Sequence, residues 1–109
     1  MREEQPRTAA HELITMTWSE YQRGECRYRG QIVRLQRKQA ELLALLLLRR
    51  GQVVSDVEIV AYLATRLRNA SSTAINSVRM NVSRLNRMMP GLIIRHRGGY
   101  EIVAPHTAS

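Results

Sequence analysis

The sequence predicts a single α+β domain with N-terminal antiparallel strands, a core of three helices and a C-terminal β-hairpin. Two observations lead to this prediction: β-prone segments lie near both ends of the chain, and apolar residues recur with a helical period between them. With 109 residues, of which 44% are hydrophobic, the chain can bury one compact core but not two. We expect the domain to span residues 13–103, with flexible tails at residues 1–12 and 104–109.

Two stretches predict the N-terminal strands. Residues 13–18 (LITMTW) are β-prone and fit an edge strand, with a short helix as the alternative. Residues 25–28 and 31–35 flank Arg29 and Gly30, and this arrangement predicts a hairpin around a glycine-containing turn.

Two helices are predicted in the middle of the chain. Residues 37–50 (RKQAELLALLLLRR) are apolar on nearly all sides, so we expect a buried central helix that ends before Gly51. After a short extended link at residues 52–54, Ser55 offers an N-cap for a second helix that runs to about Arg66. The core face of this second helix is expected to hold Ile59, Val60, Leu63 and Leu67.

A third helix is predicted at about residues 72–89, where apolar residues recur at spacings of three and four. This apolar stripe consists of Ile75, Val78, Val82, Leu85 and Met89. At about 100° per residue, the opposite face holds Thr73, Asn76, Ser77, Met80, Ser83, Arg84 and Arg87, with Arg79 on its flank.

The C-terminal segment predicts a β-hairpin. Pro90 and Gly91 end the third helix, and residues 92–95 and 100–103 form two strands across a tip at residues 96–99. A hairpin that directly follows a helix in this way has the shape of a wing.

The charge distribution suggests a partner that is a polyanion. The net charge is +8, and no Asp or Glu occurs between Glu58 and Glu101, although seven arginines lie in that interval. A solvated helix normally mixes charges of both signs, so an acid-free third helix and hairpin point to a surface that faces nucleic acid. Chance is the alternative, because the chain has only nine acids.

The polar face of the third helix has side chains suited to reading bases. Arginine pairs with guanine, asparagine with adenine, and serine or threonine with either bases or phosphates. Met80 lies in the middle of this face, where an apolar side chain suits a thymine methyl group or a protein partner. For Thr73, Ser77 and Ser83 individually, plain solvent exposure is an equal alternative.

Other classes of protein are disfavoured. No Ser-His-Asp, Cys-His or paired-carboxylate arrangement is recognisable, so we expect neither an enzyme nor a cofactor. The single cysteine, Cys26, cannot form an internal disulfide, and the three histidines lie far apart, so no metal site is expected. The apolar run at residues 42–48 is too short to span a membrane. We expect a cytoplasmic protein, bacterial or phage-encoded and associated with the nucleoid.

Residues 31–103 resemble the OmpR/PhoB-type winged helix-turn-helix, the DNA-binding effector domain of many response regulators. The similarity lies in VRLQRKQAELLALLLLRRGQVVS at residues 33–55, VSRLNRMM at 82–89 and GGYEIV at 98–103. It implies that the third helix enters the major groove and that the wing touches the minor groove or the backbone. The contacts it implies are Asn76, Ser77, Met80, Ser83 and Arg84 on the helix, and Arg95, His96 and Arg97 in the wing.

The resemblance also implies regulation of transcription, contact of the loop at residues 67–71 with RNA polymerase, and a homodimer on DNA. The chain departs from the family pattern at Gln36 and Gln39, where Thr and Glu are usual, and at the wing tip. Only about 30 residues precede the central strand, so we expect no receiver domain and no control by aspartyl phosphorylation within this chain. The main alternative is a winged helix that binds a protein; an RNA-binding domain is disfavoured because stacking aromatics are scarce.

Overall fold

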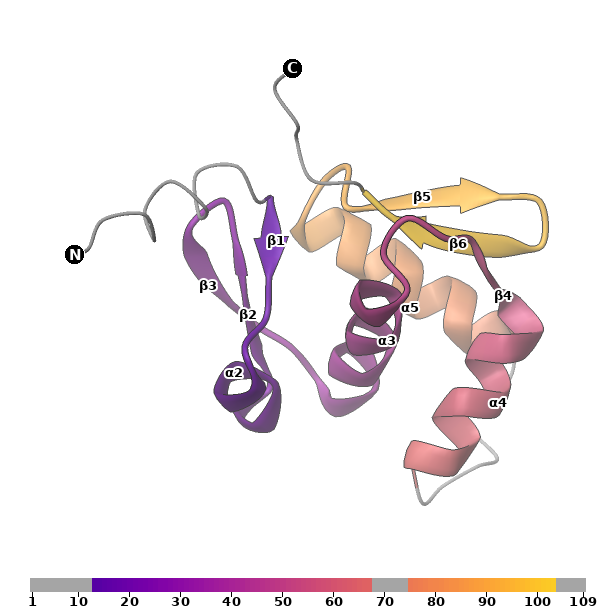
Figure 1. The fold of residues 1–109 in the computed structure, drawn as a ribbon, viewed down its shortest axis with the longest axis horizontal. Coiled ribbons are helices and arrows are strands. Elements are labelled where there is room, and N and C mark those ends of the chain that lie inside the picture. Colours follow the sequence, from indigo (N-terminus) through magenta and orange to yellow (C-terminus); the bar gives the residue numbers. More distant parts are fainter. Residues whose placement is uncertain (1–12, 68–74, 104–109) are drawn as a thin grey trace.

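The computed structural model describes residues 13–67 and 75–103, which form two small antiparallel sheets around a core of helices (Figure 1). The tails expected at residues 1–12 and 104–109, and all of the 67–71 loop except Leu67, lie outside these residues. The α+β class with N-terminal strands and a C-terminal hairpin is confirmed.

The N-terminal sheet has the strand order β1-β2-β3. The strands are β1 (Ile14–Thr15), β2 (Glu25–Tyr28) and β3 (Gln31–Arg34). The predicted hairpin joins β2 to β3, and both residues of its turn, Arg29 and Gly30, have positive φ angles of 52° and 84°. A left-handed backbone at both turn positions matches the twist of a tight hairpin.

The segment predicted as one strand at residues 13–18 is divided between two elements. Its strand part is limited to β1, and the chain then enters a helix, α2 (Trp18–Arg23). Thr17 and Glu20 form a capping box, with each side chain accepting a hydrogen bond from the other residue's backbone N–H. Gly24 ends the helix in the left-handed conformation. The short helix given as the alternative is therefore present from Trp18 onward, and its Thr-x-x-Glu and Gly signals are visible in the sequence.

The central helix, α3 (Arg37–Leu48), ends two residues earlier than predicted. Its buried side includes Leu42, Leu43, Leu45 and Leu46. The expectation of burial on nearly all sides is wrong at its C-terminal end, where Leu48 is 77% exposed. At the N-terminus the backbone N–H of Gln36 donates to Oε1 of Gln39 at 3.0 Å, so the amide side chain performs the capping role that a glutamate usually has.

The second predicted helix is α4 (Asp56–Arg66), and its N-cap is confirmed. The backbone N–H of Glu58 donates to the hydroxyl of Ser55 at 3.1 Å. Of the expected core residues, Ile59 and Leu63 are buried, and Val60 and Leu67 are partly buried against the core.

The third predicted helix is α5 (Ile75–Met88). Val78, Val82, Leu85 and Met89 are fully buried, which confirms the apolar stripe from its second member onward. Ile75 is 40% exposed, so its expected core position is wrong.

The wing belongs to a second sheet with the strand order β4-β6-β5. Its hairpin is β5 (Ile93–His96) and β6 (Gly99–Ile102), and β4 (Val54–Ser55) pairs with β6. The segment predicted as a link at residues 52–54 therefore ends in a strand. The backbone N–H of Asp56 also donates to the carbonyl of Gly98 at 2.9 Å, so the wing is bonded to the first residue of α4.

Gly99 lies where β6 pairs with β4, and the structure predicts that a methyl group added there destabilises the domain. A Cβ on Gly99 would approach the carbonyl oxygen of Val54 to 2.7 Å and a methyl of Val53 to 2.9 Å. Because one of these neighbours is backbone, Gly99→Ala is expected to destabilise the domain by about 1–3 kcal/mol, measured by urea unfolding. Unchanged stability would mean that β4 does not pair with the wing in solution.

Cys26 belongs to the core. Its side chain is fully buried, and its thiol lies 3.8 Å from the sulfur of Met89. Burial, with a smaller effect from Glu20, raises the pKa of Cys26 to about 11. The thiol is therefore neutral at physiological pH and serves as an apolar packing group that joins β2 to the end of α5.

Candidate nucleic-acid interface

The exposed face of α5 is the centre of the candidate interface. Met80 is 48% exposed on the side of the helix opposite the buried stripe. The residues exposed around it are Asn76, Arg79, Ser83, Arg84 and Arg87. Ser77, at the edge of this face, is half-buried, and Thr73 lies outside the described residues. The structure therefore presents most of the predicted helix residues on one face.

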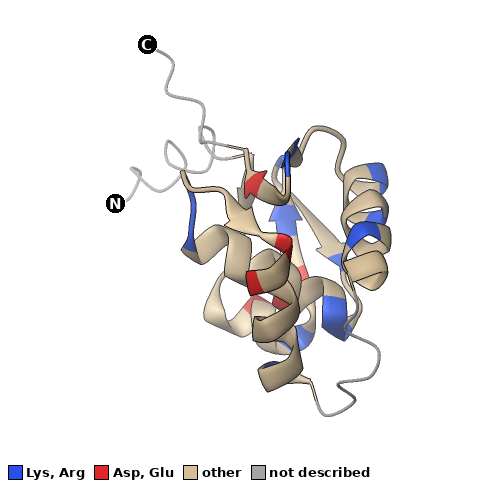
Figure 2. Cartoon of the chain, turned by 90° about the vertical axis from the view of Figure 1, so that its right-hand side faces the viewer, with Lys and Arg blue, Asp and Glu red and all other residues tan. Residues whose placement is uncertain are grey.

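This face is positively charged and lacks acids. Figure 2 shows basic residues, all of them arginines, along α5 and no Asp or Glu on that helix. The acids of α4, Asp56 and Glu58, lie in its first turn, where they favour the positive end of the helix dipole. Nothing on α5 therefore offsets the charges of its arginines.

The wing is joined to α5 by two sets of hydrogen bonds. The side-chain amide of Asn86 donates to the carbonyl of Ile93 at 3.0 Å and accepts from the N–H of the same residue at 2.8 Å. Two residues further along the same strand, Nη2 of Arg95 donates to the hydroxyl of Ser83 at 2.8 Å. The Arg95 side chain therefore lies against the exposed face of α5, and not at the tip of the wing.

The tip of the wing is tighter than predicted. The expected four-residue tip at residues 96–99 is a two-residue turn of Arg97 and Gly98, because His96 and Gly99 pair with each other. Gly98 has a φ of 77°, which few other residues adopt. Arg97 is exposed at the tip. The ring of His96 lies 2.8 Å from a carboxylate oxygen of Glu101, so this predicted contact residue has an acid beside it.

Lys38, which the sequence analysis did not select, lies at the other edge of the interface. Its Nζ donates to the hydroxyl of Ser77 at 3.0 Å and so brings the first turn of α3 to the face of α5. Lys38 and Ser77 are 39 residues apart, and no local pattern connects them. The interface thus consists of the α5 face with Arg95 at one edge and Lys38 at the other.

The part of the chain that the structure describes was compared with the features of a metal site and of a membrane span. Within residues 13–67 and 75–103, no three His, Cys, Asp or Glu side chains come close enough to hold a metal ion. Over the same ranges, no helix combines the length and apolar character needed to cross a membrane.

The solved structures that are similar to this chain include three DNA-binding or regulator domains. The C-terminal domain of the nisin resistance regulator NsrR, a lantibiotic response regulator, has a TM-score of 0.64 and 25% identity, over 83% of this chain and 90% of that one. The DNA-binding domain of CpxR from E. coli has a TM-score of 0.65 and 25% identity, over 86% and 93%. The DNA-binding domain of E. coli CadC, with a TM-score of 0.57 and 16% identity over 86% and 94%, shares the fold. No protein-family model and no curated protein matches the chain.

The helices, the second sheet and the similar structures define a winged-helix domain. The similar NsrR and CpxR structures are DNA-binding domains of OmpR/PhoB-family response regulators, which agrees with the resemblance found in the sequence.

Proposed function

We propose that this domain binds double-stranded DNA sequence-specifically and regulates transcription. The carrying observation is the acid-free face of α5, to which hydrogen bonds attach one cation from the wing, Arg95, and one from α3, Lys38. A single helix of this kind fits the major groove, and its Asn76 and Arg84 can read base edges. Arg97 at the wing tip can reach the minor groove or a phosphate. The neighbours CpxR and CadC, whose structures are described as DNA-binding domains, support this function.

The decisive experiment measures binding to DNA at several salt concentrations. The protein is incubated with genomic fragments and with random duplexes, and bound fragments are sequenced to define a cognate site. We expect affinity for both DNAs to fall with increasing salt, since phosphate contacts release counterions, and the cognate site to bind more tightly than random DNA. Binding with no sequence preference and no salt dependence would reject the proposal.

The second candidate function is that of a protein-interaction module. Met80 favours it, because this apolar side chain is exposed at the centre of a polar face. The DNA-binding proposal also includes contact with RNA polymerase through the 67–71 loop, a homodimer on DNA and a place in the cytoplasm near the nucleoid, whereas the interaction module would bind RNA polymerase or another regulatory protein in place of DNA. If the protein binds no genomic fragment more tightly than random DNA until a second protein is added, the interaction module is favoured.

Arg97→Ala tests the wing. Because Arg97 is exposed at the tip and bases are degenerate in the minor groove, its loss is expected to weaken binding about equally on cognate and random DNA. The slope of log affinity against log salt should decrease by roughly one. Arg23→Ala, which removes an arginine from α2, is the matched control and should leave the slope unchanged. An unchanged slope for Arg97→Ala would place the wing tip away from DNA.

A further inference from the structure

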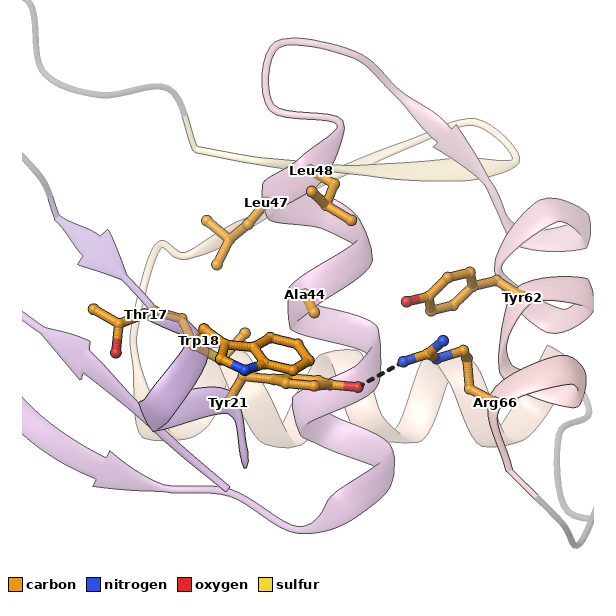
Figure 3. A pocket seen from close by; sticks show the side chains of 9 residues that line it. Thr17, Trp18, Tyr21, Ala44, Leu47, Leu48, Tyr62 and Arg66 are labelled. Carbon is orange, nitrogen blue, oxygen red and sulfur yellow. Dashed lines mark hydrogen bonds between the residues drawn. The ribbon is translucent and has the colours of Figure 1, made fainter. Parts of the chain in front are cut away.

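A groove lies on the far side of α3 from α5, between α2 and α4 (Figure 3). It encloses about 440 Å³, a volume within the usual range of small-molecule sites. Its floor is the small side chain of Ala44 on α3, which leaves space between larger residues on both sides. Trp18 and Tyr21 form one wall, and Tyr62 and Arg66 form the other.

Large apolar side chains at the rim of this groove face solvent. Trp18 is 68% exposed, and Leu48, at the upper end of the groove in Figure 3, is 77% exposed. The Trp18 ring stacks on Tyr21, with ring centroids 5.3 Å apart and an interplanar angle of 27°. An aromatic wall beside an apolar floor is the arrangement that binding sites use to bury the body of a ligand.

A buried carboxylate fixes the polar end of the groove. Glu41 is buried, and it accepts a hydrogen bond from the hydroxyl of Tyr21 at 2.7 Å. Arg66 donates from Nε to Glu41 at 3.3 Å and from Nη2 to Tyr21 at 3.0 Å, and Arg37 lies 3.6 Å from the same carboxylate. Two guanidinium groups thus face one carboxylate, which leaves a positive charge in excess at this end.

Two hydrogen-bond donors in the groove wall remain for a ligand. Among the residues that the structure describes, the hydroxyl of Tyr62 and Nη1 of Arg66 make no hydrogen bond. In Figure 3 the Tyr62 hydroxyl points into the space over Ala44. Burial raises the pKa of Tyr62, so this hydroxyl is protonated and a donor at neutral pH. A half-buried donor gains most from an acceptor that carries a charge.

We propose that this groove binds a small organic carboxylate with an aromatic or branched apolar body. The body lies over Ala44 against the ring of Trp18, and the carboxylate accepts hydrogen bonds from Nη1 of Arg66 and the hydroxyl of Tyr62. The excess positive charge at this end makes an anion the complementary ligand, because a neutral amide of the same shape offers one carbonyl oxygen and no charge, and so accepts weaker hydrogen bonds from these donors than a carboxylate does. This site is separate from the α5 interface and does not depend on DNA binding.

Trp18 allows a direct test, because it is the only tryptophan of the chain. The full chain is titrated with phenylacetate, phenylpropionate and phenylbutyrate, and with the amide of each, while Trp18 emission is recorded. We expect a saturable change with at least one acid, binding about ten-fold weaker or more for the matching amide, and no change with acetate. Equal binding of an acid and its amide, or no saturable change with any of the three acids, would overturn the proposal.

Variants of the groove separate its two halves. Tyr62→Phe keeps the ring and removes the donor, so it should weaken binding of the acid about ten-fold and weaken binding of the amide less, because a charged acceptor loses the stronger hydrogen bond. Ala44→Leu fills the floor and should abolish binding of both, whereas Ala61→Leu, at an exposed position on α4 outside the groove, should not. Circular dichroism confirms that each variant is folded. Sedimentation of the unliganded protein tests whether a second copy of the chain occupies the groove. Self-association that Trp18→Ala removes would overturn the small-molecule proposal.

Discussion

Alanine at both Asn76 and Arg84 is expected to weaken binding to the cognate DNA site by about 2–6 kcal/mol. Each side chain is exposed on α5, and a side chain that reads a base edge contributes about 1–3 kcal/mol of discrimination. The two residues lie eight positions apart, or about 12 Å along the helix axis, so their effects should be close to additive. Neither side chain is buried, so the fold should not change.

The experiment compares the double variant, both single variants and Arg23→Ala on the cognate site and on random DNA at one salt concentration. Loss on the cognate site should exceed loss on random DNA, and Arg23→Ala, which alters α2, should bind both as the parent protein does. Equal losses on the two DNAs would assign Asn76 and Arg84 to phosphate contacts. Full retention of affinity for the cognate site would show that Asn76 and Arg84 on α5 do not read its bases.

The helices and the face of α5 could be predicted because their signals are local. The capping serine at position 55 and the apolar stripe of Val78, Val82 and Leu85 lie within a few residues of the structure that they determine. The helical period that places this stripe on the buried side also places Met80 and Arg84 on the opposite face. The exposed residues of this helix could therefore be predicted without tertiary information. The DNA contacts themselves remain predictions.

The other features of the fold and of the candidate interface depend on contacts between segments that are distant in the sequence. Val54 becomes a strand because Tyr100, 46 residues later, pairs with it, and its own two-residue segment has too short a pattern to show this. Lys38 and Arg95 reach the α5 face through hydrogen bonds to Ser77 and Ser83, and the sequence does not reveal such partners. The miss at α2 differs, because its capping box was visible and β-propensity was given more weight.

Leu85→Ala is expected to reduce the free energy of unfolding by about 2–5 kcal/mol, the range for truncating a fully buried leucine. Leu85 lies between Val82 and Met89 in the buried stripe that attaches α5 to the core. A small domain is stable by about 5–15 kcal/mol, so this loss should shift the urea midpoint strongly while the m-value stays constant. Met88→Ala, at a 40% exposed neighbouring position, is the matched control and should cost much less.

The same variant separates stability from recognition. Leu85 faces the core and not the exposed side of α5, so Leu85→Ala should weaken DNA binding only by the fraction of protein that is unfolded. Lowering the temperature or adding an osmolyte should then restore affinity for the cognate site, whereas neither should restore the Asn76 and Arg84 double variant. If Leu85→Ala keeps parental stability yet loses cognate binding, the buried stripe does not attach α5 to the core. The face of α5 that contacts DNA would then differ from the one proposed.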